Sequence, residues 1–316
     1  MKRSFLAAAA VGAPLLISLF LVGCGKPKGD DDSSGEPSKG AGATTTAKTE
    51  DLKPLPSKAG ATLKGKVTLK GNPPDIAALN AKYQQDIKSK PDQIATCFDM
   101  APEAEKTEPY WHIGADNGVS DAVVWIQPPE GYYFEVDTAH KTWPDKVELS
   151  QPHCAFLPHI NWAMPMIPDA KNPKKMIPSG QEFLVSNLAK VSHNTVWKTD
   201  TGPSNAGEEG VIPAGTGAKK VSSPLKAGKD PGLVHFSCNI HPWMDAYVWV
   251  FDHPYAAITD KDGNYEIKNV PVGSKVRVVA WHEKVNYLAP GMKKGDEIEL
   301  KDGVNEKNFD VEVKEQ

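Results

Sequence analysis

Short stretches of alternating or apolar residues, separated by glycine, proline and asparagine, dominate the chain after residue 60. Stretches of this kind, bounded by turn residues, predict β-strands. Many short strands with turns between them predict an all-β fold built as a sandwich or a barrel. The expected strands cover 62–71, 121–127, 181–188, 232–238, 246–252, 264–270 and 275–281.

One segment has the spacing of a helix instead. Within residues 75–90, apolar side chains recur every three or four positions, at Ile76, Leu79, Tyr83 and Ile87. This spacing places them on one face of a helix. We therefore expect a short helix near 75–90, within an N-terminal segment of strand and helix that covers 61–120.

The N-terminus has the features of a targeting segment. Lys2 and Arg3 precede an apolar stretch that ends in Leu21-Val22-Gly23-Cys24, which predicts a secretory signal peptide over 1–23. The ending resembles the lipobox of bacterial lipoproteins, which implies lipidation of Cys24. The protein is then extracytoplasmic and lipid-anchored to a bacterial membrane, in the periplasm or at the cell surface. An ordinary signal peptide with a chance cysteine is the alternative.

The residues that follow differ in composition from the rest of the chain. Residues 24–60 contain no aromatic side chain and very few large aliphatic ones, so they bury too little apolar surface to order themselves. We expect a disordered linker there. The formal net charge of the whole chain is −4, and no basic cluster indicates a nucleic-acid partner.

One loop concentrates metal-binding chemistry. Cys238, His241 and Met244 lie within seven residues between two expected strands, and His193 lies at the end of another strand. A thiolate, two imidazoles and a weak thioether form the ligand set of a trigonal copper centre that transfers electrons. Zinc accepts cysteine and histidine but seldom methionine. The pattern therefore indicates one copper site.

The same loop carries a family resemblance. The run Cys-x2-His-Pro-Trp-Met resembles the ligand loop of amicyanin-type cupredoxins, and His193-Asn194 resembles their first-ligand strand. The resemblance implies a type 1 blue copper protein, similar to amicyanin and plastocyanin, with a Greek-key β-sandwich over 121–253. It further implies that Asn194 joins the ligand loops by hydrogen bonds. The implied copper ligands are His193, Cys238, His241 and Met244.

The resemblance also implies a function. A type 1 copper protein carries single electrons between redox partners, here extracytoplasmic ones such as a cytochrome c or a periplasmic dehydrogenase, and it is not an enzyme. In this family an exposed edge of the second histidine serves electron exchange, which implies an exit surface at His241, Pro242 and Trp243. Inward packing of Trp243 against the C-terminal module is the alternative there. Two other functions stay open: a copper-binding or delivery protein, and a surface- or carbohydrate-binding module with a degenerate cupredoxin fold.

Two cysteines remain once Cys24 and Cys238 are assigned. In an oxidising compartment, Cys97 and Cys154 are most simply a disulfide. The alternative is that Cys154 joins a second metal site with nearby histidines. The candidate histidines for a second metal site are His153, His159, His253 and His282.

A second resemblance covers the C-terminus. Residues 259–265 read Thr-Asp-x-x-Gly-x-Tyr, and 270–273 read Val-Pro-x-Gly. Both turns resemble those of carboxypeptidase regulatory-like and transthyretin-like β-sandwiches. The resemblance implies a second, small β-sandwich module over 254–316. Residues 63–71 resemble the opening strand of such modules, so residues 61–75 are a candidate for completing it.

Overall fold

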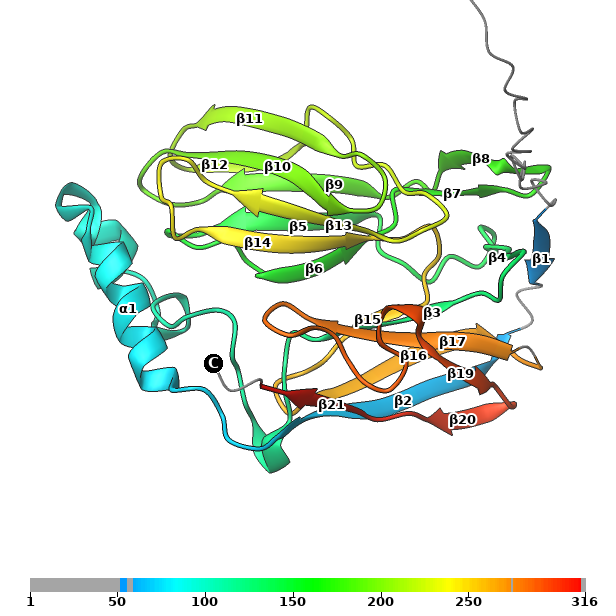
Figure 1. The fold of residues 1–316 in the computed structure, drawn as a ribbon. Coiled ribbons are helices and arrows are strands. Elements are labelled where there is room, and N and C mark those ends of the chain that lie inside the picture. The colour runs from blue at the N-terminus through cyan, green and yellow to red at the C-terminus, as the bar shows by residue number, and fades with distance from the viewer. Residues whose placement is uncertain (1–51, 56–58, 274, 314–316) are drawn as a thin grey trace, which may run out of the picture. The chain divides into compact units, whose positions relative to one another are not determined.

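The computed structural model describes residues 52–55, 59–273 and 275–313. The expected signal peptide, the lipidated Cys24 and most of the linker lie outside the described residues. Within the described part, no helix is both long and apolar enough to cross a membrane. The predicted all-β class with one short α-helix is confirmed, because strands account for far more of these residues than helices do (Figure 1).

The first β-sandwich consists of a five-stranded sheet and a three-stranded sheet (Figure 1). Between them lies an apolar core that includes Leu149, Val185, Phe236 and Val248. The hairpin of β7 (Met166–Asp169) and β8 (Asn172–Pro178) forms a separate small sheet. In sheet order, the larger sheet contains β11 (Ala206–Ile212), β10 (His193–Thr201), β13 (Gly232–Ser237), β14 (Asp245–Val250) and β6 (Ile160–Ala163). The smaller sheet contains β12 (Thr216–Lys220), β9 (Glu182–Asn187) and β5 (Lys146–Gln151).

The second β-sandwich is built from strands far apart in the sequence. One of its sheets contains β15 (Ala256–Ile258), β3 (Val123–Gln127), β17 (Lys275–His282), β18 (Asn286–Tyr287) and β19 (Asp296–Glu299). The other contains β16 (Asn264–Pro271), β2 (Ala59–Lys70), β20 (Gly303–Glu306) and β21 (Phe309–Glu312). Because β2 pairs with β16, β20 and β21, residues 61–70 belong to the C-terminal sandwich.

The structure corrects two expected boundaries. The 121–253 unit begins too early, because β3 pairs with β15 and β17 of the second sandwich rather than with the first. The sequence does not show this, since both faces of β3 are apolar: Val124 faces the second core and Trp125 a third cluster. The linker expected over 24–60 ends earlier than 60. Within it, β1 (Lys53–Leu55) pairs with β4 (Tyr132–Phe134), and Leu55 is buried in the second core.

The third apolar cluster joins the two sandwiches. Trp125 of β3 lies against Trp249 of β14, with ring centroids 4.6 Å apart, and Trp281 of β17 lies 5.6 Å from Trp249. All three side chains are at most 3 % exposed. Burying one large apolar side chain this fully stabilises the folded protein by about 1.5–3 kcal/mol.

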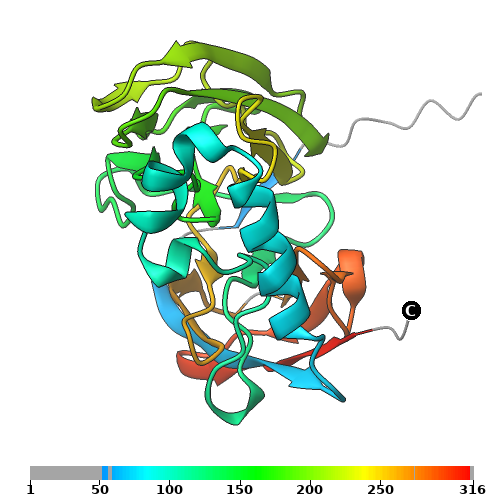
Figure 2. The same cartoon turned by 90° about the vertical axis from the view of Figure 1, so that its left-hand side faces the viewer.

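The expected helix is present as α1 (Ile76–Lys88), and Asp75 caps it by accepting a hydrogen bond from the backbone of Ala78. Its two ends contact different cores. Ile76 and Leu79 pack against the second core, whereas Tyr83 and Ile87 are buried in the first. Figure 2 shows the helix, in cyan, lying across the side of the two sandwiches. Short helical turns elsewhere are η1 (Pro91–Gln93), η2 (Ala95–Asp99), η3 (Glu103–Glu105), η4 (Ala115–Asn117) and η5 (Met292–Lys294).

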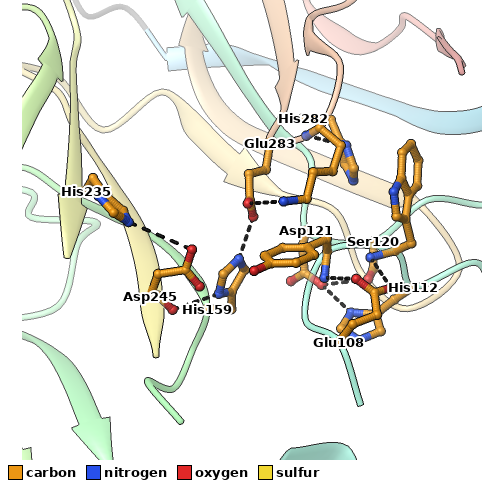
Figure 3. A network of polar contacts seen from close by, with 12 residues as sticks. Glu108, His112, Ser120, Asp121, His159, His235, Asp245, His282 and Glu283 are labelled. Atoms are coloured by element: carbon orange, nitrogen blue, oxygen red, sulfur yellow. Dashed lines mark hydrogen bonds and ion pairs between the residues drawn. The ribbon is translucent and has the colours of Figure 1, made fainter. Parts of the chain in front are cut away.

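A buried histidine also connects the sandwiches (Figure 3). His159 contacts oxygen atoms with both ring nitrogens: Nδ1 lies 3.0 Å from the backbone oxygen of Asp245, and Nε2 lies 2.5 Å from a Glu283 carboxylate oxygen. Carbonyl and carboxylate oxygens accept, so this geometry favours the doubly protonated ring. Burial alone lowers the pKa of His159, but the hydrogen bond and charge of Glu283 outweigh it and raise the pKa above its ordinary value.

This pair makes stability depend on pH. In Glu283→Gln the buried His159 loses its carboxylate partner, and we expect the free energy of unfolding to fall by about 3 kcal/mol. Because the folded pKa of His159 is raised, the contribution is complete below about pH 6.5 and is lost as the pH rises through the folded value.

Urea unfolding of parent and variant across this pH range measures the difference. Glu297→Gln, which removes an exposed pair with Lys275, is the matched control and should change little. A Glu283→Gln deficit that does not shrink with rising pH would contradict the charged pair.

Candidate metal centre

Antiparallel pairing brings the expected ligands to one end of the first sandwich. His193 begins β10, Cys238 directly follows β13, and His241 and Met244 lie in the loop before β14. β13 is hydrogen-bonded to both β10 and β14. Neighbouring antiparallel strands run in opposite directions, so the start of β10, the end of β13 and the start of β14 meet at the same edge.

Three of the four expected ligands form a compact group. Cys238 Sγ lies 4.0 Å from His193 Nδ1 and 3.8 Å from His241 Nδ1. The two imidazole rings have centroids 4.6 Å apart. All three side chains are buried, and Cys238 is a free thiol.

These separations fit a trigonal metal site. Zinc forms bonds of about 2.3 Å to sulfur and about 2.0 Å to nitrogen, and two such bonds at 120° place the sulfur and nitrogen about 3.7 Å apart. The observed distances of 3.8 and 4.0 Å need only a small adjustment. One thiol and two Nδ1 atoms are thus arranged as a donor set for copper or zinc.

Asn194 holds the two ligand segments together, as its expected role requires. Its Oδ1 accepts a hydrogen bond from the backbone of Asn239 at 2.8 Å and one from the Cys238 thiol at 3.3 Å. Met244 closes the loop through its backbone: its N–H donates to His241 and its carbonyl accepts from Cys238. Its thioether is buried in the first core, and its role as an axial ligand stays a prediction.

Both histidines have their outer nitrogen occupied. His193 Nε2 donates to the backbone oxygen of His153 at 2.7 Å, and His241 Nε2 donates to the side-chain oxygen of Gln93. Burial lowers the pKa of His193 to about 4. Burial, followed by the nearby His193, lowers the pKa of His241 to about 4 as well. Both rings are therefore neutral near pH 7, the form that binds a metal.

The expected exit surface is not present. His241 is 0 % exposed, and Trp243 is 7 % exposed with its Nε1 donating to the backbone oxygen of Cys154 at 3.0 Å. Of the three expected residues, Pro242 alone is exposed. The outer edge of His241 is covered by Gln93 and by Cys97, whose Sγ lies 4.0 Å from His241 Nε2. The expectation of an exposed imidazole edge is therefore wrong. Trp243 does pack inward, but against the first core and not against the C-terminal module.

A disulfide joins Cys97 and Cys154, with 2.03 Å between their sulfur atoms. Both residues are buried in the core of the first sandwich. The bridge ties η2, in the segment after α1, to the loop that follows β5. It thereby holds the segment 91–99 over His241.

His153, His159, His253 and His282, the candidates for a second metal site, do not gather into one. Among residues 52–55, 59–273 and 275–313, neither group of close histidine, cysteine and acidic donors includes any of them. His153 contacts Glu105 at 3.1 Å, and His159 contacts Glu283. His253 and His282 are buried and accept backbone hydrogen bonds from Tyr255 and Lys284.

Gln93 is the site residue that the sequence did not indicate. It lies 148 positions before His241 and outside the family motif, so no spacing connects the two. Protein-family models, curated proteins and solved structures give no match to this chain. The ligand set is therefore inferred from the residues and their geometry.

Proposed function

We propose that the protein holds one copper ion at His193, Cys238, His241 and Met244 and carries single electrons. The observation that supports this most directly is the buried group of one thiol and two Nδ1 atoms at trigonal separation. Copper bound by one thiolate and two imidazoles passes between its two oxidation states by gaining or losing one electron.

The surrounding residues suit such a role. The core of the first sandwich buries Cys238 and Met244, which excludes water from the metal. Asn194 and the outer contacts of both histidines fix the donors where a metal needs them, so little movement accompanies a change of charge. A site that moves little exchanges electrons at a low energetic cost.

The location follows from the same proposal. An anchor at Cys24 places the protein on a membrane surface, where it exchanges electrons with an extracytoplasmic redox protein such as a cytochrome c or a dehydrogenase. The Cys97–Cys154 disulfide suits an oxidising compartment. The His241 edge is not the route for electrons in this proposal, because Gln93 and Cys97 cover it.

One observation favours a second function. A covered His241 slows electron exchange with a protein partner, and this suits a protein that binds or delivers copper without a redox partner. The two functions differ in rate: an electron carrier exchanges electrons quickly with a small redox protein, whereas a copper-holding protein does not.

The first test removes the thiolate. Cu(II) bound to the Cys238 thiolate should give an intense charge-transfer band in the visible spectrum, as blue copper sites do. In Cys238→Ser the soft anionic ligand is absent, and we expect the band to disappear. Circular dichroism of the same sample checks that the variant is folded. A Ser variant as strongly coloured as the parent would contradict the ligand assignment.

The second test concerns the axial position. A weak thioether donor stabilises Cu(II) more than Cu(I), so Met244→Leu should keep copper and colour but raise the reduction potential. Met164→Leu is the matched control, because Met164 is equally buried but lies in a separate cluster beside Trp143 and Ile167. A lowered potential in Met244→Leu, or a shift of equal size in the control, would count against an axial role.

A further inference from the structure

The two histidines of the metal centre are held in the same way by different parts of the chain. In each ring, Nδ1 faces Cys238 and Nε2 donates to an oxygen atom. For His193 the acceptor is the backbone oxygen of His153, and for His241 it is the side-chain oxygen of Gln93. A backbone oxygen is present whatever the residue is, whereas the acceptor for His241 depends on glutamine at position 93.

The acceptor decides which nitrogen can bind a metal. A neutral imidazole carries one proton, and the nitrogen without it offers the lone pair. An oxygen that only accepts keeps the proton on Nε2 and leaves the lone pair on Nδ1, the atom that faces Cys238. We propose that Gln93 is a positioning residue of the metal centre, which holds His241 as the Nε2–H tautomer with Nδ1 directed at the metal. This inference rests on the proposed copper function.

The position of Gln93 is itself fixed by covalent structure. Gln93 ends η1, and four residues later Cys97 is joined to Cys154 by the disulfide. Cys154 follows His153, whose backbone oxygen holds the other imidazole, and its own carbonyl accepts the Trp243 N–H. The disulfide therefore links the two segments that hold the outer nitrogens of both histidines, although these segments are distant in sequence.

A purely space-filling role for Gln93 is the competing interpretation. Gln93 is half-buried over a fully buried ring, and a side chain of similar size would fill the same space. Two variants distinguish these interpretations. Gln93→Leu keeps the bulk of the side chain but has no hydrogen-bond acceptor, whereas Gln93→Glu keeps an acceptor oxygen.

The experiment compares these variants in the full chain, with Gln127→Leu as the control. Gln127 is a half-buried glutamine at the end of β3 in the second sandwich. The first measurement is ¹⁵N NMR of the imidazole nitrogens in the copper-free protein. We expect His241 to carry its proton on Nε2 in the parent, in Gln93→Glu and in the control, and to be a mixture of tautomers in Gln93→Leu.

The second measurement is Cu(I) affinity, by competition with a coloured chelator. Loss of a partner that orients a ligand weakens metal binding by about 10–100-fold, which we expect for Gln93→Leu. Gln93→Glu should restore the parent affinity, and the control should match the parent. An unchanged tautomer and affinity in Gln93→Leu, or equal losses in Gln93→Leu and Gln93→Glu, would overturn the positioning role.

Failure of this inference is distinct from failure of the proposed function. A parent protein that does not bind Cu(I) contradicts the copper function, and the copper-free NMR comparison still decides whether Gln93 sets the tautomer. A parent that binds Cu(I) tightly, with a Gln93→Leu variant that binds equally well and keeps the Nε2–H form, contradicts only the role of Gln93.

Discussion

Hydrogen bonding among β10, β13 and β14 determines where the side chains of the candidate metal centre lie. His193 and Cys238 are far apart in sequence, and only the antiparallel register between β10 and β13 places them together. A shift of one residue in that register would turn the side chains of a strand to the opposite face of the sheet. The apolar core beneath the strands prevents such a shift, because Trp197 and Phe236 would lose their buried positions. The geometry of the centre thus depends on the packing of the sandwich.

The second constraint on the centre comes from outside the sandwich. The segment 91–99 lies over His241, is fastened by a disulfide, and follows a helix that contacts the cores of both sandwiches. A centre closed in this way is protected from water and from competing ligands. The same cover buries the His241 ring, so the electron transfer that we propose needs a different path through the protein.

The sequence located the residues of the candidate centre better than the residues that surround them. The Cys-x2-His run and the distant His-Asn pair indicated residues that the fold does bring together, because they lie next to strand ends that alternating patterns can locate. The helix near 75–90 could be predicted equally well, since its apolar residues recur at helical spacing. The role of Gln93 could not be predicted, because its contact with His241 spans 148 positions and leaves no local pattern in the sequence.

The strand expected at 121–127 is present, but its assignment to the first sandwich was wrong for a related reason. β3 has buried side chains on both faces, and a strand of that kind shows no alternation to indicate which sheet it joins. Its pairing with β15 and β17 depends on contacts distant in sequence, including the tilted ring contact of Trp125 with Trp249 between the sandwiches. The prediction of an exit surface at His241 was wrong because residues 91–99 cover this ring. These residues lie in a part of the chain that the cupredoxin motif does not include.

X-ray absorption at the copper edge, recorded on the copper-loaded full chain, tests the central claim most directly. It reports the atoms bound to the metal without depending on colour or on a partner protein. The proposed centre predicts one short copper–sulfur bond from Cys238 and two copper–nitrogen bonds from His193 and His241. A spectrum with only oxygen and nitrogen neighbours, and no short bond to sulfur, would contradict it.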